Sequence, residues 1–305
     1  MKRDFLHISD FTSQEILDLI SFAGELKIKL RNKDFIPPFK NHSLAMVFAK
    51  QSARTRVSFE TGFKMLGGHA VYLSPSDISI GKREEIKDIA RVLSGYNDMI
   101  MARLFDHQHI IELAQYSNIP VINGLTDYNH PCQIMADIFT IYENRENLDD
   151  LKIVYVGDGN NIVHSWIHLA SRIPFHFTCI CPEGFEPDKK TIDLISDTSI
   201  SSFELSHDPI NDVIGADIIY TDVWASMGQK DELENRENTF APFQVTSTML
   251  KSTGKKTLFM HCLPAERGRE VTDEVMESTN SIVFNQAENR MHMQNAIMVM
   301  LAGKM

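Results

Sequence analysis

Apolar and polar positions along this chain follow two rhythms, which predict strands followed by helices. In the first half, short apolar runs are each followed by a segment with apolar residues at helical spacing. The predicted strands there are 44–49, 70–73, 98–102 and 120–123, and the predicted helices are 57–66, 84–93, 109–116 and about 133–143. Strands separated by helices at this spacing predict crossover connections and a parallel sheet.

The second half repeats this alternation after a charged segment at 143–150, which marks a domain boundary. The predicted strands are 152–156, 177–181, 201–205, 217–221, 257–260 and 282–284, and the predicted helices are 163–172, 189–195 and 286–301. A looser polar stretch at 222–238 is expected to be irregular. The pattern predicts an α/β protein with two doubly wound parallel-sheet domains, 1–148 and 149–285, and a cleft between them. The last segment, 286–305, is expected to form a helix that returns to the first domain.

Before the first strand, Thr12-Ser-Gln-Glu15 has the pattern of a capping box that opens an amphipathic helix. The residues expected on its buried face are Ile16, Leu17, Leu19, Ile20, Ala23 and Leu26.

Polar residues follow the predicted strands at six places along the chain. These residues are Ser52, Arg103, His130, Asn161, Asp222 and His261. Because ligands of doubly wound sheets bind at the carboxyl ends of the strands, the six positions predict an active site there.

Composition limits the possible partners. The formal net charge of -11 over 305 residues argues against general binding to nucleic acids or to anionic membranes. No apolar run approaches the roughly 20 residues that a membrane span needs, and the N-terminus does not have the pattern of a signal peptide. Four cysteines in a chain of this length do not predict a disulfide framework, and Cys179-Ile-Cys181 lacks the second ligand pair of a zinc site. We therefore expect a cytoplasmic protein.

The segment Ser52-Ala-Arg-Thr-Arg56 lies between a predicted strand and a predicted helix. Backbone N–H groups at a helix N-terminus, joined by the donors of Ser52, Arg54 and Thr55, suit a phosphate dianion. The alternative is an ordinary capped helix with solvated arginines. Arg56 lies four residues before Glu60, so we expect an ion pair between them.

Gly157-Asp-Gly-Asn-Asn161 also lies between a strand and a helix, which raises the possibility of a dinucleotide site. The motif lacks the third glycine of the dinucleotide fingerprint, and no acidic residue suited to a ribose follows about 20 residues later. A nicotinamide-dependent oxidoreductase is therefore the weaker alternative, and no cofactor is expected.

Several separated motifs occur in one order along the chain. They are SARTR at 52–56, HPCQ at 130–133, DVWASMG at 222–228, HCLP at 261–264 and AENR at 287–290. In this order they resemble the aspartate/ornithine carbamoyltransferase family, and within it the members that act on ornithine. The resemblance extends from about residue 5 to about residue 301.

The resemblance implies transfer of the carbamoyl group of carbamoyl phosphate to the side-chain amine of L-ornithine, giving L-citrulline and phosphate. The implied mechanism is direct attack through a tetrahedral intermediate, without a metal, in a homotrimer of arginine metabolism. The residues implied to bind carbamoyl phosphate are Ser52, Ala53, Arg54, Thr55, Arg103, His130, Gln133, Cys262, Leu263 and Arg290. Those implied to bind ornithine are Asn161, Asp222, Ser226 and Met227. The resemblance implies a mobile lid that closes over ornithine, with Asp222, Ser226 and Met227 as its ligands and Gly228 as its hinge. Arg103, His130, Gln133, Asp222 and Cys262 are the implied catalytic residues.

The residues themselves leave other interpretations open. Arg103 could form a structural ion pair, Arg290 could pair with Glu288, and Asp222 could belong to a solvated loop. Cys262 next to His261 has the pattern of a nucleophile, but carbamoyl phosphate is already activated and the family uses direct attack. We expect Cys262 and Leu263 instead to receive the side-chain ammonium.

The chain departs from the family at two positions. Ala53 replaces a common threonine, and Ser79 replaces the residue that in relatives reaches a neighbouring subunit's phosphate site. Lys82 or Arg83 could take over that role. Other acceptors, such as aspartate, putrescine or an N-acylated ornithine, and a non-catalytic relative with the same fold are the remaining alternatives.

Overall fold

The structure, a computed structural model, describes residues 2–78, 84–145, 147–225 and 233–305. Within these residues the chain divides into two compact units, Met1–Phe139 with Asn289–Met305, and Thr140–Glu288. The predicted boundaries at 148/149 and 285/286 were placed on sequence grounds and stay predictions. Ser79, Lys82, Arg83, Ser226, Met227 and Gly228 lie outside the described residues.

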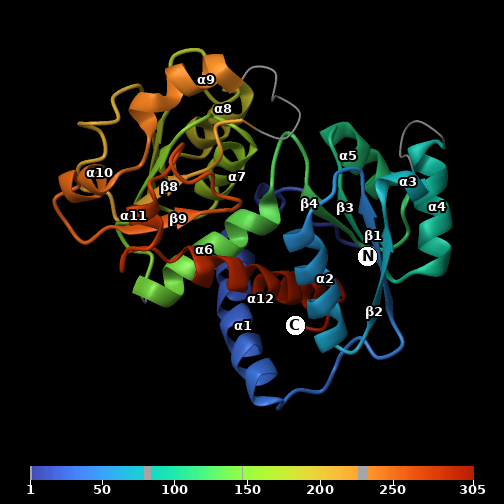
Figure 1. Cartoon of the computed structure of the whole chain (residues 1–305). Helices are drawn as coiled ribbons and strands as arrows, with labels where there is room; N and C mark the ends of the chain where they lie inside the picture. Colours follow the sequence, from blue (N-terminus) through green and yellow to red (C-terminus); the bar gives the residue numbers. More distant parts are fainter. Residues whose placement is uncertain (1, 79–83, 146, 226–232) are drawn as a thin grey trace. The chain divides into compact units, whose positions relative to one another are not determined.

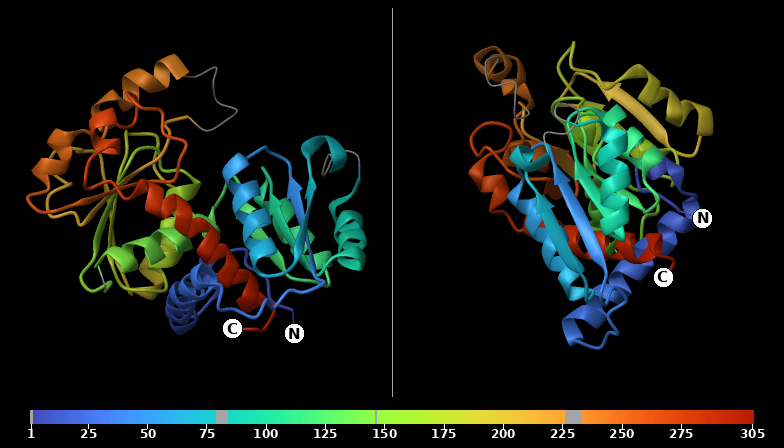
Figure 2. Two further views of the ribbon diagram at one scale, coloured as in Figure 1. Left: turned by 60° about the horizontal axis from the view of Figure 1, so that its bottom comes forward. Right: turned by 90° about the vertical axis from the view of Figure 1, so that its right-hand side faces the viewer.

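The first unit is built on a four-stranded parallel sheet with the strand order β2-β1-β3-β4. Its strands are β1 (Ser43–Phe48), β2 (His69–Leu73), β3 (Met99–Arg103) and β4 (Val121–Leu125). Its helices are α1 (Ser13–Asn32), α2 (Ala53–Met65), α3 (Pro75–Ile78), α4 (Ile86–Tyr96) and α5 (His107–Tyr116), with the short turn η1 (Ile8–Asp10) before them. Strands β1 and β2 pair in parallel and lie side by side, in blue, in the right-hand view of Figure 2.

One face of this sheet is covered by α4 and α5, which lie side by side (Figure 1). Ala45, Val47 and Ile100 pack there against Ile89 and Leu113 in a buried apolar cluster. The alternation of side chains along a strand sends the intervening residues of β1 to the opposite face. All six residues of β1 are buried, as expected for a strand covered on both sides.

The second unit holds a five-stranded parallel sheet with the order β7-β6-β5-β8-β9. Its strands are β5 (Lys152–Val156), β6 (His176–Ile180), β7 (Ser202–Ser206), β8 (Ile218–Thr221) and β9 (Leu258–His261). Its helices are α7 (Asn161–Ala170), α8 (Lys189–Thr198), α9 (Leu233–Phe240), η3 (Ala241–Phe243), α10 (Ser247–Ser252) and α11 (Asp273–Met276). Two further helices, α6 (Pro131–Arg145) and α12 (Val283–Leu301), contain the boundaries between the units.

The prediction of two parallel α/β sheets is confirmed. In each sheet the strand order reverses beside the first strand, between β1 and β3 and between β5 and β8. Such a reversal separates the loops that follow the two strands and leaves room for a ligand between them. The candidate residues follow these four strands and the neighbouring β4 and β9.

Three local predictions were wrong. Residues 282–284, predicted as a strand, lead into α12, and only Ser281 bridges to β9. The polar stretch predicted as irregular contains α9; its few apolar residues do not recur at helical spacing, so the pattern did not predict this helix. Leu17 has 44% of its surface exposed, although the other five residues expected on the inner face of α1 are buried.

Candidate active site

The turn between β1 and α2 supplies the first group of polar atoms. Ser52 is the N-cap of α2, and its hydroxyl accepts a hydrogen bond from the backbone N–H of Thr55 at 3.3 Å. Ala53 and Arg54 follow as exposed residues of the first helical turn, whereas Thr55 is fully buried. The cap fixes a helix N-terminus whose partial positive charge and N–H groups suit an anion.

Two buried arginines converge on Thr55. Its hydroxyl oxygen accepts hydrogen bonds from Nη1 of Arg103 at 3.3 Å and from Nη2 of Arg290 at 3.2 Å. Only 8% of Arg103 and 4% of Arg290 is exposed. Two guanidinium groups drawn together away from water repel each other, and a bound dianion relieves that repulsion.

His130 is buried beside these arginines, immediately before α6. Burial, followed by the charges of Arg290 and Arg103, holds the pKa of His130 well below its usual range. The imidazole is therefore neutral near pH 7. It can form a hydrogen bond with a neutral group without adding a third positive charge to those of Arg103 and Arg290.

Gln133 lies one turn further along α6 and is also buried. Its Nε2 donates a hydrogen bond to Oδ1 of Asp137 at 2.8 Å, which fixes the orientation of the amide. Its Oε1 has no hydrogen-bond partner in the described part of the protein. A buried acceptor of this kind is suited to an N–H group of a ligand, such as a carbamoyl amide.

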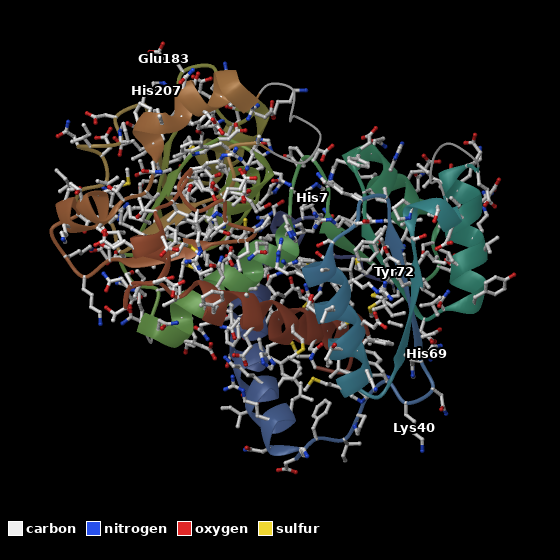
Figure 3. The ribbon with its side chains drawn as sticks, viewed as in Figure 1. His7, Lys40, His69, Tyr72, Glu183 and His207 are labelled. Carbon is white, nitrogen blue, oxygen red and sulfur yellow. The ribbon has the colours of Figure 1, made fainter. Side chains whose placement is uncertain are left out.

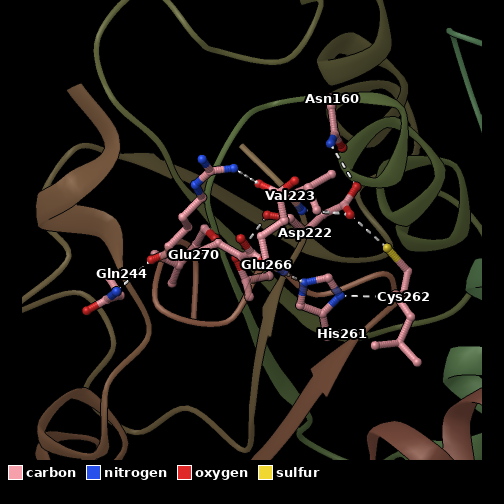
Figure 4. A network of polar contacts seen from close by, with 12 residues as sticks. Asn160, Asp222, Val223, Gln244, His261, Cys262, Glu266 and Glu270 are labelled. Carbon is pink, nitrogen blue, oxygen red and sulfur yellow. Dashed lines mark hydrogen bonds and ion pairs between the residues drawn. The ribbon is translucent and has the colours of Figure 1, made fainter. Parts of the chain in front are cut away.

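In the second unit, Asp222 follows β8 and is buried among three hydrogen-bond donors (Figure 4). The thiol of Cys262 donates to Oδ1 at 3.0 Å, and Nδ2 of Asn160 donates to Oδ2 at 3.1 Å. The backbone N–H of Val223 donates to Oδ1 at 2.8 Å. These donors fix a carboxylate at the strand end, where it can accept further hydrogen bonds from a cationic ligand.

His261 shapes the loop that carries Cys262. Its Nδ1 accepts a hydrogen bond from the backbone N–H of Leu263 at 2.9 Å, so the proton of the neutral ring lies on Nε2. Nε2 in turn lies 3.0 Å from Oε1 of Glu270, in a fully buried pair. Leu263 has a φ of 60°, and the bond to His261 holds this left-handed conformation.

Asp222, His261 and Cys262 also place one potential metal ligand each within 4.8 Å of one another. Both ring nitrogens of His261 are engaged, with Leu263 and with Glu270, and the thiol is directed at Asp222. A cation would have to displace these bonds, so the arrangement fits a hydrogen-bonded network better than a metal centre.

Sequence reasoning missed two parts of this network. Asn160, which donates a hydrogen bond to Asp222, was not among the predicted residues; the predicted Asn161 is the next residue and the first of α7. Arg236 of α9 pairs with Asp158 at 2.8 Å and donates to the carbonyl oxygen of Trp224 at 2.6 Å. Burial raises the pKa of Asp158, Arg236 opposes that rise, and the nearby Asp222 adds to it. The motif at 157–161 marked the loop, but no pattern in the sequence pointed to an arginine so far along the chain.

The remaining predicted residues fall into two sets. Ser52, Ala53, Arg54, Thr55, Arg103, His130, Gln133 and Arg290 belong to the first unit, and Asn161, Asp222, Cys262 and Leu263 belong to the second. The expected ion pair between Arg56 and Glu60 is present at 3.2 Å.

Comparison with known proteins covers nearly the whole chain. Residues 3–143 match the carbamoyl-P binding domain of aspartate/ornithine carbamoyltransferase, and residues 149–301 match its Asp/Orn binding domain. The chain belongs to the aspartate/ornithine carbamoyltransferase family. A chloroplastic ornithine carbamoyltransferase of Pisum sativum is 59% identical over 303 residues, which is 99% of this chain and 81% of that protein.

Solved structures of this family agree with the fold. Ornithine carbamoyltransferase from Pyrococcus furiosus has a TM-score of 0.94 and 46% identity, covering 100% of this chain and 98% of the other. The anabolic enzyme from Campylobacter jejuni has a TM-score of 0.92 and 33% identity, with 100% of both chains covered. The two family domains match the two sheets, one for each unit.

Proposed function

We propose that this carbamoyltransferase transfers the carbamoyl group of carbamoyl phosphate to the side-chain amine of L-ornithine. The products are L-citrulline and phosphate, as in arginine metabolism. The observation that carries the proposal is the match of both family domains over nearly all of the chain, together with 59% identity to an ornithine carbamoyltransferase.

The first set of residues suits carbamoyl phosphate. Ser52, Arg54 and the backbone of Ala53 and Thr55 would bind the phosphate at the N-terminus of α2. Arg103 and Arg290 would neutralise the dianion and the oxyanion that develops on the carbonyl. Neutral His130 would contact the carbonyl oxygen, and Oε1 of Gln133 would accept a hydrogen bond from the carbamoyl amide.

The second set suits an amino acid with a side-chain amine. Asp222 would bind the α-ammonium, and Asn161, Ser226 and Met227 would bind the rest of the amino-acid backbone. Cys262 and Leu263 would receive the reacting amine, whose lysine-like pKa requires loss of a proton before attack. Attack on the carbonyl carbon, collapse of the tetrahedral intermediate and departure of phosphate would then need only positioning and electrostatic stabilisation from the chain.

The assembly is proposed to be a homotrimer located in the cytoplasm. Val57 of α2 and Val71 of β2, with 59% and 43% of their surface exposed, are apolar positions that a subunit interface would cover. No helix in the described part of the chain combines the length and the hydropathy that crossing a bilayer requires. Light scattering after size-exclusion chromatography would test the trimer, and cell fractionation would test the location.

The function is tested by measuring ureido products from carbamoyl phosphate with four amines in parallel. Product from L-ornithine alone is expected, because only ornithine offers both an α-ammonium for Asp222 and a side-chain amine. Product from aspartate, putrescine or N-acetylornithine instead would contradict the assignment of the second set. The absence of any product would contradict carbamoyl transfer itself.

A further inference from the structure

A chain of hydrogen bonds links the N-terminal segment to the loop that carries His130. Nε2 of His7, a residue labelled in Figure 3, lies 2.8 Å from Nε2 of His107. Nδ1 of His107 lies 2.9 Å from the hydroxyl of Thr126, which accepts the backbone N–H of Asn129 at 3.3 Å. We propose that His107 is a positioning residue that holds the 126–130 loop, and through it His130, in the geometry that binds the carbamoyl group.

The directions of these bonds are mutually consistent. Nδ1 of His7 lies 3.4 Å from Oδ2 of Asp10, so the proton of a neutral His7 belongs on Nδ1. Nε2 of His7 then accepts from Nε2–H of His107, and Nδ1 of His107 accepts from the hydroxyl of Thr126. His107 thus donates from Nε2 and accepts at Nδ1, which defines its tautomer. The Thr126 hydroxyl also lies 3.4 Å from the carbonyl oxygen and 3.3 Å from Oδ1 of Asn129, within the same loop.

The loop is held from a second side by buried amides. Nδ2 of Asn129 donates to the carbonyl oxygen of Leu6 at 3.2 Å, and Nδ2 of Asn123 donates to the same oxygen at 3.2 Å. Thr126 and Asn129 are both buried, and the N–H of Thr126 donates to the carbonyl oxygen of Asn129 at 2.9 Å. The loop therefore closes on itself, and His107 is the side chain of α5 that anchors its Thr126 end.

The surroundings of His107 favour its neutral form. Tyr128 packs against its ring with a centroid distance of 4.9 Å, and His7 packs edge-on at 4.7 Å. Burial lowers the pKa of His107 to about 4; repulsion from His7, when that ring is protonated, acts in the same direction, and Asp106 and Asp10 oppose the shift. Near pH 7, Nδ1 is therefore available as the acceptor that Thr126 requires.

The consequence for the reaction follows from the position of His130. Asn129 is its direct neighbour in the chain, and the carbonyl oxygen of His130 accepts the N–H of Gln133 at 3.1 Å as α6 begins. A loop displaced at Thr126 would move His130 and the first turn of α6 together. This inference rests on the proposed role of His130 and Gln133 in binding carbamoyl phosphate.

His107→Phe tests the inference because it keeps a ring in place and removes both hydrogen bonds. We expect kcat/KM for carbamoyl phosphate to fall about tenfold, the effect of losing a buried hydrogen bond, while the KM for ornithine changes little. Amide hydrogen exchange at 126–130 should accelerate. His107→Gln, which retains a donor and an acceptor, should recover part of the loss, and Thr126→Val should reproduce it.

His109→Phe is the matched control, because His109 lies on the same helix, is partly exposed and has its Nε2 3.9 Å from Oδ2 of Asp106. It should leave kcat/KM within about twofold of the unaltered protein. Unchanged exchange at 126–130 in both His107→Phe and Thr126→Val would overturn the inference, as would equal losses in His107→Phe and His109→Phe. If the unaltered protein formed no product, the proposed function would fail, and the exchange experiment would still decide whether His107 holds the loop.

Discussion

The candidate residues of the first unit and those of the second unit, here called the first and the second half-site, are held in place in different ways. In the first unit, the polar groups lie on regular elements or at their ends, and the two arginines meet directly on Thr55 at the start of α2. In the second unit, Asp222 depends on side chains from two other loops, Asn160 and Cys262. The first half-site is therefore fixed mainly by the fold, and the second by a network in which each side chain orients the next.

The difference suits the two substrates that we propose. A phosphate dianion is recognised by positive charge and N–H groups, which a helix N-terminus and buried arginines supply without proton exchange. An amine that must lose a proton requires hydrogen-bond partners of defined direction in its surroundings, and the bonded pair of Asp222 and Cys262 is such a group. Charge thus dominates one half-site and hydrogen-bond direction the other.

Replacement of Arg103 by methionine should have the largest effect. It removes one of the two guanidinium groups from Thr55, and we expect kcat/KM for carbamoyl phosphate to fall roughly 1000-fold. Arg56→Met is the matched control, since Arg56 forms an exposed pair with Glu60 and should change kcat/KM less than about twofold. Steady-state kinetics would decide, and a loss below about tenfold for Arg103→Met would remove the arginine pair from the account.

Arg236→Met should disturb the second unit without touching the first. The substitution leaves the largely buried carboxylate of Asp158 without the arginine of this ion pair, which should lower the free energy of unfolding by about 3 kcal/mol. Adding Asp158→Asn should recover much of this loss, because the charge that lost its partner is gone. A double-mutant cycle by urea unfolding measures the coupling, and strictly additive effects would show that the pair is not coupled.

Thiol labelling should distinguish Cys262 in the second half-site from the three buried cysteines. Cys132, Cys179 and Cys181 are buried, whereas Cys262 is partly exposed. Burial raises the pKa of Cys132 to about 12, which keeps its thiol protonated and unreactive. We expect mass spectrometry to find Cys262 modified at least about tenfold faster than the others, and ornithine with carbamoyl phosphate to slow that reaction. Equal labelling of Cys132 would contradict this.

Protonation of His107 should have a smaller effect, on the stability of the first unit at low pH. The pKa of His107 is about 4 in the folded protein, below the usual 6.5. As the pH falls, His107 is therefore protonated in the unfolded chain before it is protonated in the folded protein. His107 should therefore contribute a loss of stability as the pH falls from about 6.5 to about 4. The groups that face it are His7, Asp10, Asp106 and Tyr128. Urea midpoints at pH 7 and pH 5 should differ less in His107→Gln than in His109→Gln; equal differences would contradict this assignment.

Much of the fold and of the first half-site could be predicted from the sequence, because the information is local. The apolar run before Lys50, followed by Ser52 and a helical pattern, predicts a strand, a cap and a helix in that order. The same rule places Arg103 at the end of β3 and Asp222 directly after β8, since side chains at strand ends follow directly from the strand pattern.

The errors arose where distant contacts decide the structure. Val283 and Phe284 have a β-branched and aromatic pattern typical of strands, yet they begin α12, because tertiary packing overrides weak local propensity. The contact of Asn160 with Asp222 spans 62 residues of sequence and was not predicted, because no local pattern contains it. The pairing of Arg236 with Asp158 spans 78 residues of sequence, so no local pattern contains it.

The division of roles between the half-sites is tested most directly by ligand binding to Asp222→Asn. Carbamoyl phosphate should still raise the melting temperature of this variant as it does for the unaltered protein, because Arg103, Arg290 and Thr55 are intact. Ornithine added with it should give no further increase, since the carboxylate that meets the α-ammonium is gone. Asp193→Asn, an exposed position of α8, should respond to both ligands. Loss of the carbamoyl phosphate response in Asp222→Asn alone would contradict the account.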